Sequence, residues 1–223
     1  MPSGRLHEVQ AAARPTIRPY AAAAAVAPPA ASQPLRGIKI LDLSTVIAGP
    51  ACCAMLADFG ATVTKVEPPG GDSWRSGGAM FQQDNRGKRS VCLDLTAEEG
   101  YHILLQMLAD TDVLVTNMRG RALQKLRCDY ETLQSVKPDL VFALLTAHGL
   151  EGPDTELPGY DIGAFWARSG LQELSGTTRD TLANYPGGNG DHTTAHTFFK
   201  FHAAWSCAVK YVVGCIVREV SDC

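Results

Sequence analysis

Short apolar runs alternate with longer amphipathic stretches through the middle of this chain. Five runs have the length and character of buried strands, at residues 38–43, 61–66, 90–95, 113–115 and 140–145. The pattern between them predicts a loop over 68–87 and helices over 50–59, from 96 onward, 121–126 and 130–136. Apolar strands that alternate with helices favour a parallel sheet that is buried on both faces. We therefore predict an α/β fold, with a Rossmann-like parallel sheet and helices on both of its faces.

Local signals support two of these helices. Pro50 is acceptable in a first helical turn, and Gly60 provides the left-handed residue that often ends a helix. The helix that starts at Thr96 has two acidic residues in its first turn. An apolar stripe follows within it, formed by Ile103, Leu104, Met107 and Leu108.

The two ends of the chain differ from its middle. Residues 1–36 contain eleven Ala, six Pro, four Arg and a single acid, Glu8. This composition fits either a disordered leader or a mitochondrial transit peptide. If the segment is not a targeting signal, we expect the chain to be cytoplasmic. Residues 196–223 form a divergent tail, in which five residues fall near one face at helical spacing: Phe201, Trp205, Ala208, Val212 and Cys215. The predicted folded segment is residues 37–195.

Composition excludes several classes of partner. The 223 residues are 45% hydrophobic and have a formal net charge of −3, so there is no basic surplus for nucleic acid or for an anionic membrane. The longest apolar stretch, 198–217, is interrupted by Lys200 and Lys210, which argues against a spanning helix. The seven cysteines lack the spacing of disulfide frameworks or zinc sites, so we expect buried thiols and no metal.

The common nucleotide and hydrolase motifs are absent. The loop after the first strand has one glycine rather than G-x-G-x-x-G, and neither a P-loop nor G-x-S-x-G occurs. Hydride transfer, ATP hydrolysis and serine hydrolysis are therefore disfavoured.

A series of motifs, in order, resembles the class III CoA-transferase family, which also contains the α-methylacyl-CoA racemases. The motifs lie at residues 41–50, 56–61, 65–70, 85–90 with 93–95, 112–117, 152–153 with 159–161, and 188–191. The resemblance implies a large-domain segment of an interlaced homodimer, with an acyl-CoA and a free carboxylic acid as substrates and CoA as the transferred group. Members of the family are much longer, so we expect a truncated member. The alternative to an active transferase is a non-catalytic fragment or CoA-binding module.

The resemblance makes Asp191 the catalytic nucleophile, which would form aspartyl anhydride and aspartyl-CoA thioester intermediates. The physical pattern agrees with this role. Gly188 and Gly190 have no side chains, so a thioester can approach the backbone closely and backbone N–H groups can face a developing oxyanion. Alternatively, the two glycines only form the turn. On residue type alone, a cap of the following helix is the favoured role for Asp191, and the family motifs reverse this preference.

Tyr160 separates the two branches of the family. Racemases that resemble this chain have His in the motif Gly-His-Asp, whereas here it is Gly159-Tyr160-Asp161. A phenol with an ordinary pKa near ~10 is a poor base at neutral pH, so transfer is favoured over racemisation. His148 and His192 are nearby but stand in other positions.

The resemblance also implies a CoA site. Its predicted residues are Val46, Ile47, Leu93, Asn117, Met118, Lys125 and Leu126. Plain core packing would equally explain the apolar members, and a solvated helix surface would explain Lys125. The pair Phe165-Trp166 resembles the branch that acts on aryl or branched 2-hydroxy acids, although adjacent aromatic residues also serve packing.

Overall fold

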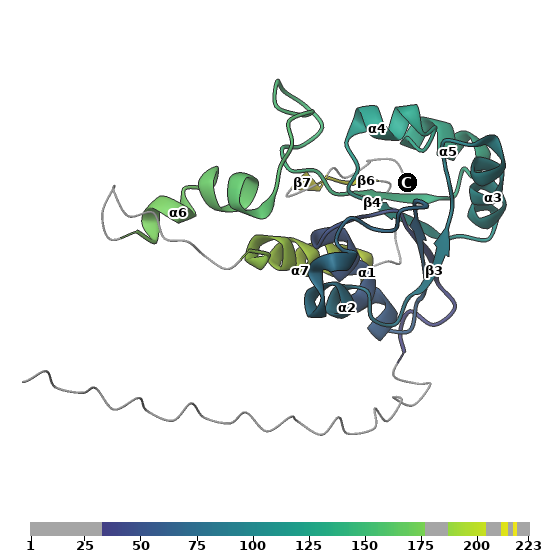
Figure 1. Cartoon of the computed structure of the whole chain (residues 1–223), viewed down its shortest axis with the longest axis horizontal. Helices are drawn as coiled ribbons and strands as arrows, with labels where there is room; N and C mark the ends of the chain where they lie inside the picture. The colour runs from purple at the N-terminus through teal and green to yellow at the C-terminus, as the bar shows by residue number, and fades with distance from the viewer. Residues whose placement is uncertain (1–32, 177–186, 204–210, 214–215, 218–223) are drawn as a thin grey trace, which may run out of the picture.

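The computed structural model describes residues 33–176, 187–203, 211–213 and 216–217. Strands and helices alternate through most of this part of the chain (Figure 1). The order is β1 (Lys39–Asp42), α1 (Ala48–Asp58), β2 (Thr62–Glu67), the 3-10 turn η2 (Arg75–Gly77), α2 (Ala79–Asp84), β3 (Arg89–Cys92), α3 (Glu98–Ala109), β4 (Val113–Thr116), α4 (Gly120–Lys125), α5 (Tyr130–Val136), β5 (Val141–Leu144), the π-helical segment η3 (Asp161–Ala167), α6 (Leu171–Leu174), α7 (Asn189–Ala203), β6 (Tyr211–Val213) and β7 (Ile216–Val217).

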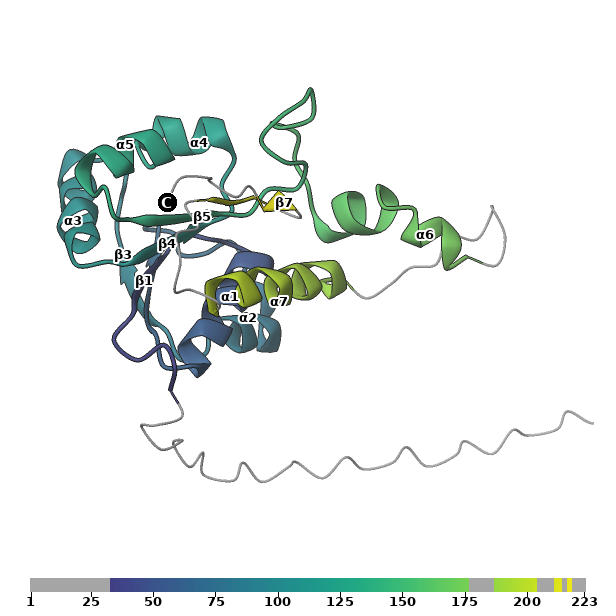
Figure 2. The ribbon, with the colours of Figure 1, turned by 180° about the vertical axis from the view of Figure 1, so that it is seen from behind.

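The strands form one sheet in the order β3-β2-β1-β4-β5-β6-β7. All neighbours pair in parallel except β6 and β7, which are antiparallel. Helices α3, α4 and α5 cover one face, and α1, α2 and α7 cover the other (Figures 1 and 2). The predicted α/β class, with a parallel sheet and helices on both faces, is confirmed.

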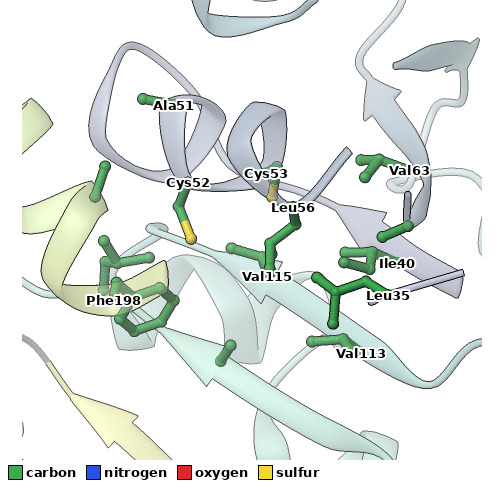
Figure 3. Packing of buried hydrophobic residues seen from close by; sticks show 14 residues of the cluster. Leu35, Ile40, Ala51, Cys52, Cys53, Leu56, Val63, Val113, Val115 and Phe198 are labelled. Carbon is green, nitrogen blue, oxygen red and sulfur yellow. The ribbon is translucent and has the colours of Figure 1, made fainter. Parts of the chain in front are cut away.

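Alternation along the strands gives each face its own core. On β4, Val113 and Val115 point to the α1 side, whereas Leu114 points to the α3 side. Figure 3 shows the α1 side, where Cys52 of α1 and Phe198 of α7 lie in the same buried cluster over the sheet. Helix α7 thus packs along α1 although it follows it by more than a hundred residues, and this packing places the start of α7 near the ends of β1 and β4 (Figure 2).

Two expectations about local structure are wrong. Residues 68–87 are not all loop, because η2 and α2 lie within them. The sequence of α2, Ala-Met-Phe-Gln-Gln-Asp, has no clear apolar stripe, and the helix is held by its contact with α1 and by the buried Asp84. The tail is also not one helix through Val212, because α7 ends at Ala203 and Val212 pairs with Ala143 as part of β6. A helical period in a short apolar tail cannot exclude a strand.

Other differences concern single residues. Leu35, assigned by sequence to the leader, is buried, and its N–H donates to the carbonyl of Phe59 at 3.0 Å. Residues 1–32 of the predicted leader lie outside the described residues. Ile103 of the predicted stripe is exposed. Cys92 is exposed as well, against the expectation of buried thiols, whereas the other cysteines of the described chain, Cys52, Cys53 and Cys128, are buried and free.

Candidate functional site

The order of the strands reverses between β1 and β4, and open parallel sheets leave a crevice at such a point beyond the carboxyl ends of the strands. A cleft of about 310 Å³ lies there. Its walls come from residues 45–48 after β1, residues 117–119 after β4, residues 158–160 before η3, Ala122 of α4 and Asp191 of α7. The fold therefore brings four separate segments to one edge of the sheet.

A side-chain amide joins the loops that follow β1 and β4. Asn117 accepts a hydrogen bond from the N–H of Thr45 at 2.9 Å and donates one to the carbonyl of Thr45 at 2.8 Å. The next residue, Val46, has φ of 68°, a left-handed conformation that is unfavourable for a β-branched side chain. Such strain persists only where the surroundings fix the backbone, and the Asn117 clamp does so here.

A cluster of buried charges lies beneath the loop after β1. Asp42 accepts hydrogen bonds from the N–H and hydroxyl of Ser44, and its other oxygen lies 2.8 Å from Nζ of Lys88. Lys65, also buried, donates to the carbonyl of Ser44 at 2.7 Å and pairs with Asp72 at 2.8 Å. Burial raises the pKa of Asp42, but Lys88 and Lys65 outweigh it and leave that pKa below its ordinary value. The loop after β1 is therefore fixed both by these buried charges and by the hydrogen bonds of Asn117.

On the opposite wall, Asp161 positions Asp191. Asp191 is half-buried in the first turn of α7, and its N–H donates to Oδ1 of Asp161 at 2.9 Å. Oδ2 of Asp161 accepts the N–H of Gly188 and Nε1–H of Trp166, each at 3.1 Å. Asp161 is 7% exposed. One buried carboxylate therefore ties the start of α7 to η3.

The structure gives the glycines of this turn packing roles. Gly188 has φ of 95°, which favours glycine, and Asp161 accepts its amide. A methyl group at Gly190 would collide with the ring of Phe165 and the carboxylate of Asp161, whereas Gly187 has open space around it. These contacts explain why the turn needs glycine; the oxyanion role that the sequence suggests for Gly188 and Gly190 remains a prediction.

The pKa values of the aspartates on the two sides of the cleft are shifted in opposite directions, since that of Asp42 is lowered and that of Asp191 is raised. Burial, together with the negative charge of Asp161, raises the pKa of Asp191 from its ordinary 3.8 to about 6, although His192 partly offsets the shift. His192 lies beside it on α7. Burial lowers the pKa of His192, but its hydrogen bond to Asp84 and the charge of Asp84 outweigh burial and raise it. Asp191 is thus a carboxylate whose ionised form is poorly compensated.

The cleft brings together some of the residues predicted to bind CoA but not all of them. Val46, Ile47, Asn117 and Met118 line it together with Asp191. Three others lie outside its lining: Leu93 is buried in the core on the α3 side, Leu126 packs against that core, and Lys125 is exposed in the last turn of α4.

Tyr160 lines the cleft and is 71% exposed, which places the residue that stands in the racemase-histidine position at the rim. His148 is partly buried, and its Nδ1 has no hydrogen-bond partner among the described residues.

Sequence reasoning gave no role to Asp161 or Asp84. Asp161 stands in the motif 159–161, and a signal was available there, because this motif supplies a second carboxylate in addition to Asp191. Asp84 gave no signal, because it stands in a segment that the sequence predicts as loop. Only the packing of α2 near α7 brings it to His192, at 3.0 Å.

Within the described ranges, no group of three or more His, Cys, Asp or Glu residues is arranged to hold a metal ion. Of the helices described, none has both the length and the apolar character needed to cross a bilayer.

Residues 35–205 match the family described as CoA-transferase family III. The chain is 40% identical over 168 residues to the cinnamoyl-CoA:phenyllactate CoA-transferase of Clostridium sporogenes, covering 70% of this chain and 41% of the relative. It is 35% identical over 170 residues to the (R)-2-hydroxy-4-methylpentanoate CoA-transferase of Clostridioides difficile, covering 71% of this chain and 43% of the relative. The chain thus spans about two fifths of the length of these curated relatives.

Solved structures agree in fold. A CaiB/BaiF family protein from Brucella suis superposes with a TM-score of 0.72 at 32% identity, over 78% of this chain and 49% of that chain. The protein Rv3272 from Mycobacterium tuberculosis gives a TM-score of 0.74 at 31% identity, over 81% of this chain and 53% of that chain.

Proposed function

The chain belongs to CoA-transferase family III, and from this premise we propose that it transfers CoA from an acyl-CoA to a free carboxylic acid through Asp191. The observation that carries the proposal is the position of Asp191. It is the carboxylate that lines the cleft at the switch point of the sheet, opposite the loops that follow β1 and β4.

The reaction uses Asp191 as a covalent carrier. A carboxylate oxygen of Asp191 attacks the thioester carbonyl, a C–O bond forms, the C–S bond breaks, and the CoA thiolate leaves. The thiolate then attacks the Asp191 carbonyl of this mixed anhydride, which releases the donor acid and gives an aspartyl-CoA thioester. The acceptor carboxylate attacks that thioester to form a second anhydride, and the thiolate takes the acceptor acyl group, which frees Asp191.

The environment of Asp191 supports this role. With a pKa of about 6, the side chain is ionised above neutral pH, as a nucleophile must be. Burial and the neighbouring Asp161 disfavour that ion, so conversion to a neutral anhydride or thioester removes an unfavourable charge. The same two features therefore lower the cost of forming the covalent intermediate.

We propose that the acyl end of CoA enters the cleft beside Val46, Ile47, Asn117 and Met118. A volume of about 310 Å³ suits the reacting end of the molecule rather than the whole cofactor. Leu93, Lys125 and Leu126 do not line this cleft, so in this proposal they do not contact the acyl end of CoA.

The relatives' names support an aryl or branched 2-hydroxy acid as acceptor, since they act on phenyllactate and on 2-hydroxy-4-methylpentanoate. The pair Phe165 and Trp166 is already engaged in packing, because Phe165 lies against Gly190 and Trp166 donates to Asp161. The acceptor proposal therefore rests on the relatives rather than on these two aromatic residues.

Adduct mapping tests the proposal. The chain is incubated with cinnamoyl-CoA, the intermediate is trapped with hydroxylamine or borohydride, and the modified residue is located by mass spectrometry. We expect modification at Asp191, its loss in Asp191→Ala, and its retention in the control Asp110→Ala, which alters an exposed carboxylate. Modification of a different carboxylate would refute the assignment, and CoA binding without any adduct would favour a CoA-binding module.

Racemisation is tested separately. A racemase must exchange the substrate α-proton with solvent, and Tyr160 is a poor base for that step. We expect no enzymatic uptake of deuterium at the α-carbon of a 2-methylacyl-CoA in deuterated water. Uptake that disappears in Tyr160→Phe would support the racemase instead.

A further inference from the structure

His192 is held between two hydrogen-bond acceptors. Its Nδ1 lies 2.7 Å from the carbonyl oxygen of Gly188, and its Nε2 lies 3.0 Å from Oδ1 of Asp84. A carbonyl oxygen cannot donate, and an ionised carboxylate cannot donate either. With Asp84 ionised, both ring nitrogens carry a proton in order to satisfy both contacts, and the ring is then an imidazolium cation.

A positive charge on His192 would stabilise the buried carboxylate of Asp84. It is 1% exposed, and its second oxygen, Oδ2, has no hydrogen-bond partner among the described residues. An isolated buried carboxylate is unfavourable, so it requires either a proton or a nearby positive charge. His192 is the cation recorded in contact with it, at 3.0 Å.

Two further carboxylates lie near His192, and His196 follows it by one helical turn as an exposed residue of α7. Asp191 precedes it on α7, and Asp161 faces the same turn from η3. From α1, which packs along α7, the buried ionisable groups are Cys52 and Cys53, and burial raises the pKa of both thiols far above neutral pH. At the far end of α1, Asp58 is paired with Arg86. The imidazolium thus stands among three carboxylates.

We propose that Asp84 and His192 are a positioning pair, in which Asp84 keeps His192 doubly protonated so that the imidazolium fixes the Gly188 carbonyl and favours the ionised form of Asp191. The pair opposes Asp161, which disfavours that ionised form, and the reactivity of Asp191 reflects the balance between the two. The proposal rests on the proposed function only in giving Asp191 a chemical role; the pairing itself is independent of any substrate.

The experiment titrates the side chains of the full chain by NMR. Imidazole resonances report the pKa of His192, assigned through His192→Gln, and carboxyl ¹³C resonances report the pKa of Asp191, assigned through Asp191→Asn. Asp84→Asn removes the buried charge with little change in shape, because its amide can donate to Nε2 of a neutral ring that still donates from Nδ1. Asp110→Asn, which alters an exposed carboxylate, is the matched control.

In the unaltered chain, we expect His192 to titrate above the ordinary histidine pKa of about 6.5. In Asp84→Asn, we expect the pKa of His192 to fall by about one unit or more, because its anionic partner has been lost. We expect the pKa of Asp191 to rise, because loss of the positive charge on His192 outweighs loss of the more weakly acting negative charge on Asp84. The control should leave both pKa values unchanged. If Asp84→Asn does not fold, the titration of the unaltered chain still decides whether His192 is held as a cation.

Two results would overturn the proposal. One is a His192 that titrates at or below ~6.5 in the unaltered chain. The other is an Asp191 whose pKa stays constant while that of His192 falls. Failure of the proposed function would look different, because both pKa values would shift as expected while adduct mapping found no modification at Asp191.

Discussion

Asp42 and Asp191 are two aspartates near the same cleft, and their surroundings shift their pKa values in opposite directions. Asp42 is completely buried, but Lys88 and Lys65 compensate its charge and lower its pKa. Asp191 is less buried, yet the nearby Asp161 adds to the effect of burial and raises its pKa to about 6. Depth of burial alone therefore does not decide whether a carboxylate is inert. The neighbouring charges decide it.

The two regions also use backbone strain differently. Beneath the loop after β1, hydrogen bonds and ion pairs hold Val46 in a left-handed conformation that its side chain disfavours. In the turn before Asp191, the left-handed position is Gly188, for which that conformation costs little. We infer that the first region is a rigid wall of the cleft, and that the second places a reactive group close to a neighbouring helix.

Substitution of the reactive carboxylate should have the largest effect. Asp191→Asn keeps the shape of the side chain but removes the proposed nucleophile, so release of CoA from an acyl-CoA should slow by about a thousandfold or more. Initial rates of thiol release measure this. Asp42→Asn, compared at an equal amount of folded protein, should keep the rate of thiol release of the unaltered chain, because Asp42 does not line the cleft. A rate of thiol release in Asp191→Asn close to that of the unaltered chain would contradict the proposal that Asp191, and not Asp42, reacts with the acyl-CoA.

Breaking the compensated pair should mainly affect stability. Lys88→Met leaves Asp42 buried without its nearest cation, and removal of one partner of a buried pair costs about 3–5 kcal/mol. Denaturant unfolding measures this change. The matched control is Lys39→Met, which removes a lysine from an exposed pair with Asp110 and should cost no more than about 1 kcal/mol. An equal loss of unfolding free energy in the two variants would show that the buried pair stabilises the fold no more than the exposed pair does.

The close approach of α7 to η3 can be tested with two neighbouring glycines. Gly190→Ala forces a methyl group against Phe165 and Asp161, so it should destabilise the fold by about 1–3 kcal/mol and slow adduct formation by displacing Asp191. Gly187→Ala enters open space and should change the free energy of unfolding by no more than about 0.5 kcal/mol. Thermal unfolding and adduct rates measured on both variants would separate packing from a general effect of alanine in the turn.

The layered fold could be predicted from sequence because its signal is local. The apolar runs at 38–43, 61–66 and 140–145 overlap β1, β2 and β5, with each end shifted by one residue. Helix α2 was missed because six residues without an apolar stripe give no periodic signal, and tertiary contacts stabilise it instead. The same limit applies to the site. Asp191 could be singled out from its motif. Asp161, which accepts its N–H, stands 30 residues away, and Asp84, which contacts His192, stands 108 residues from that histidine. Only packing brings these residues together.

The pH dependence of stability provides the last and smallest test of the contrast between the two aspartates. The pKa of Asp191 is higher in the folded chain, about 6, than its ordinary value of 3.8, so ionisation of this group opposes folding. The cost is absent below the lower pKa, grows between the two values, and is constant above the higher one. Asp191→Asn should therefore stabilise the chain by about 1 kcal/mol above pH ~7, less than full linkage predicts because the side chain is partly exposed, and should have no such effect near pH ~4. Denaturant unfolding of both chains across this range measures the difference. A stabilisation that is equal at both ends would show that shape, rather than charge, distinguishes the variant, and that Asp191 is as well compensated as Asp42.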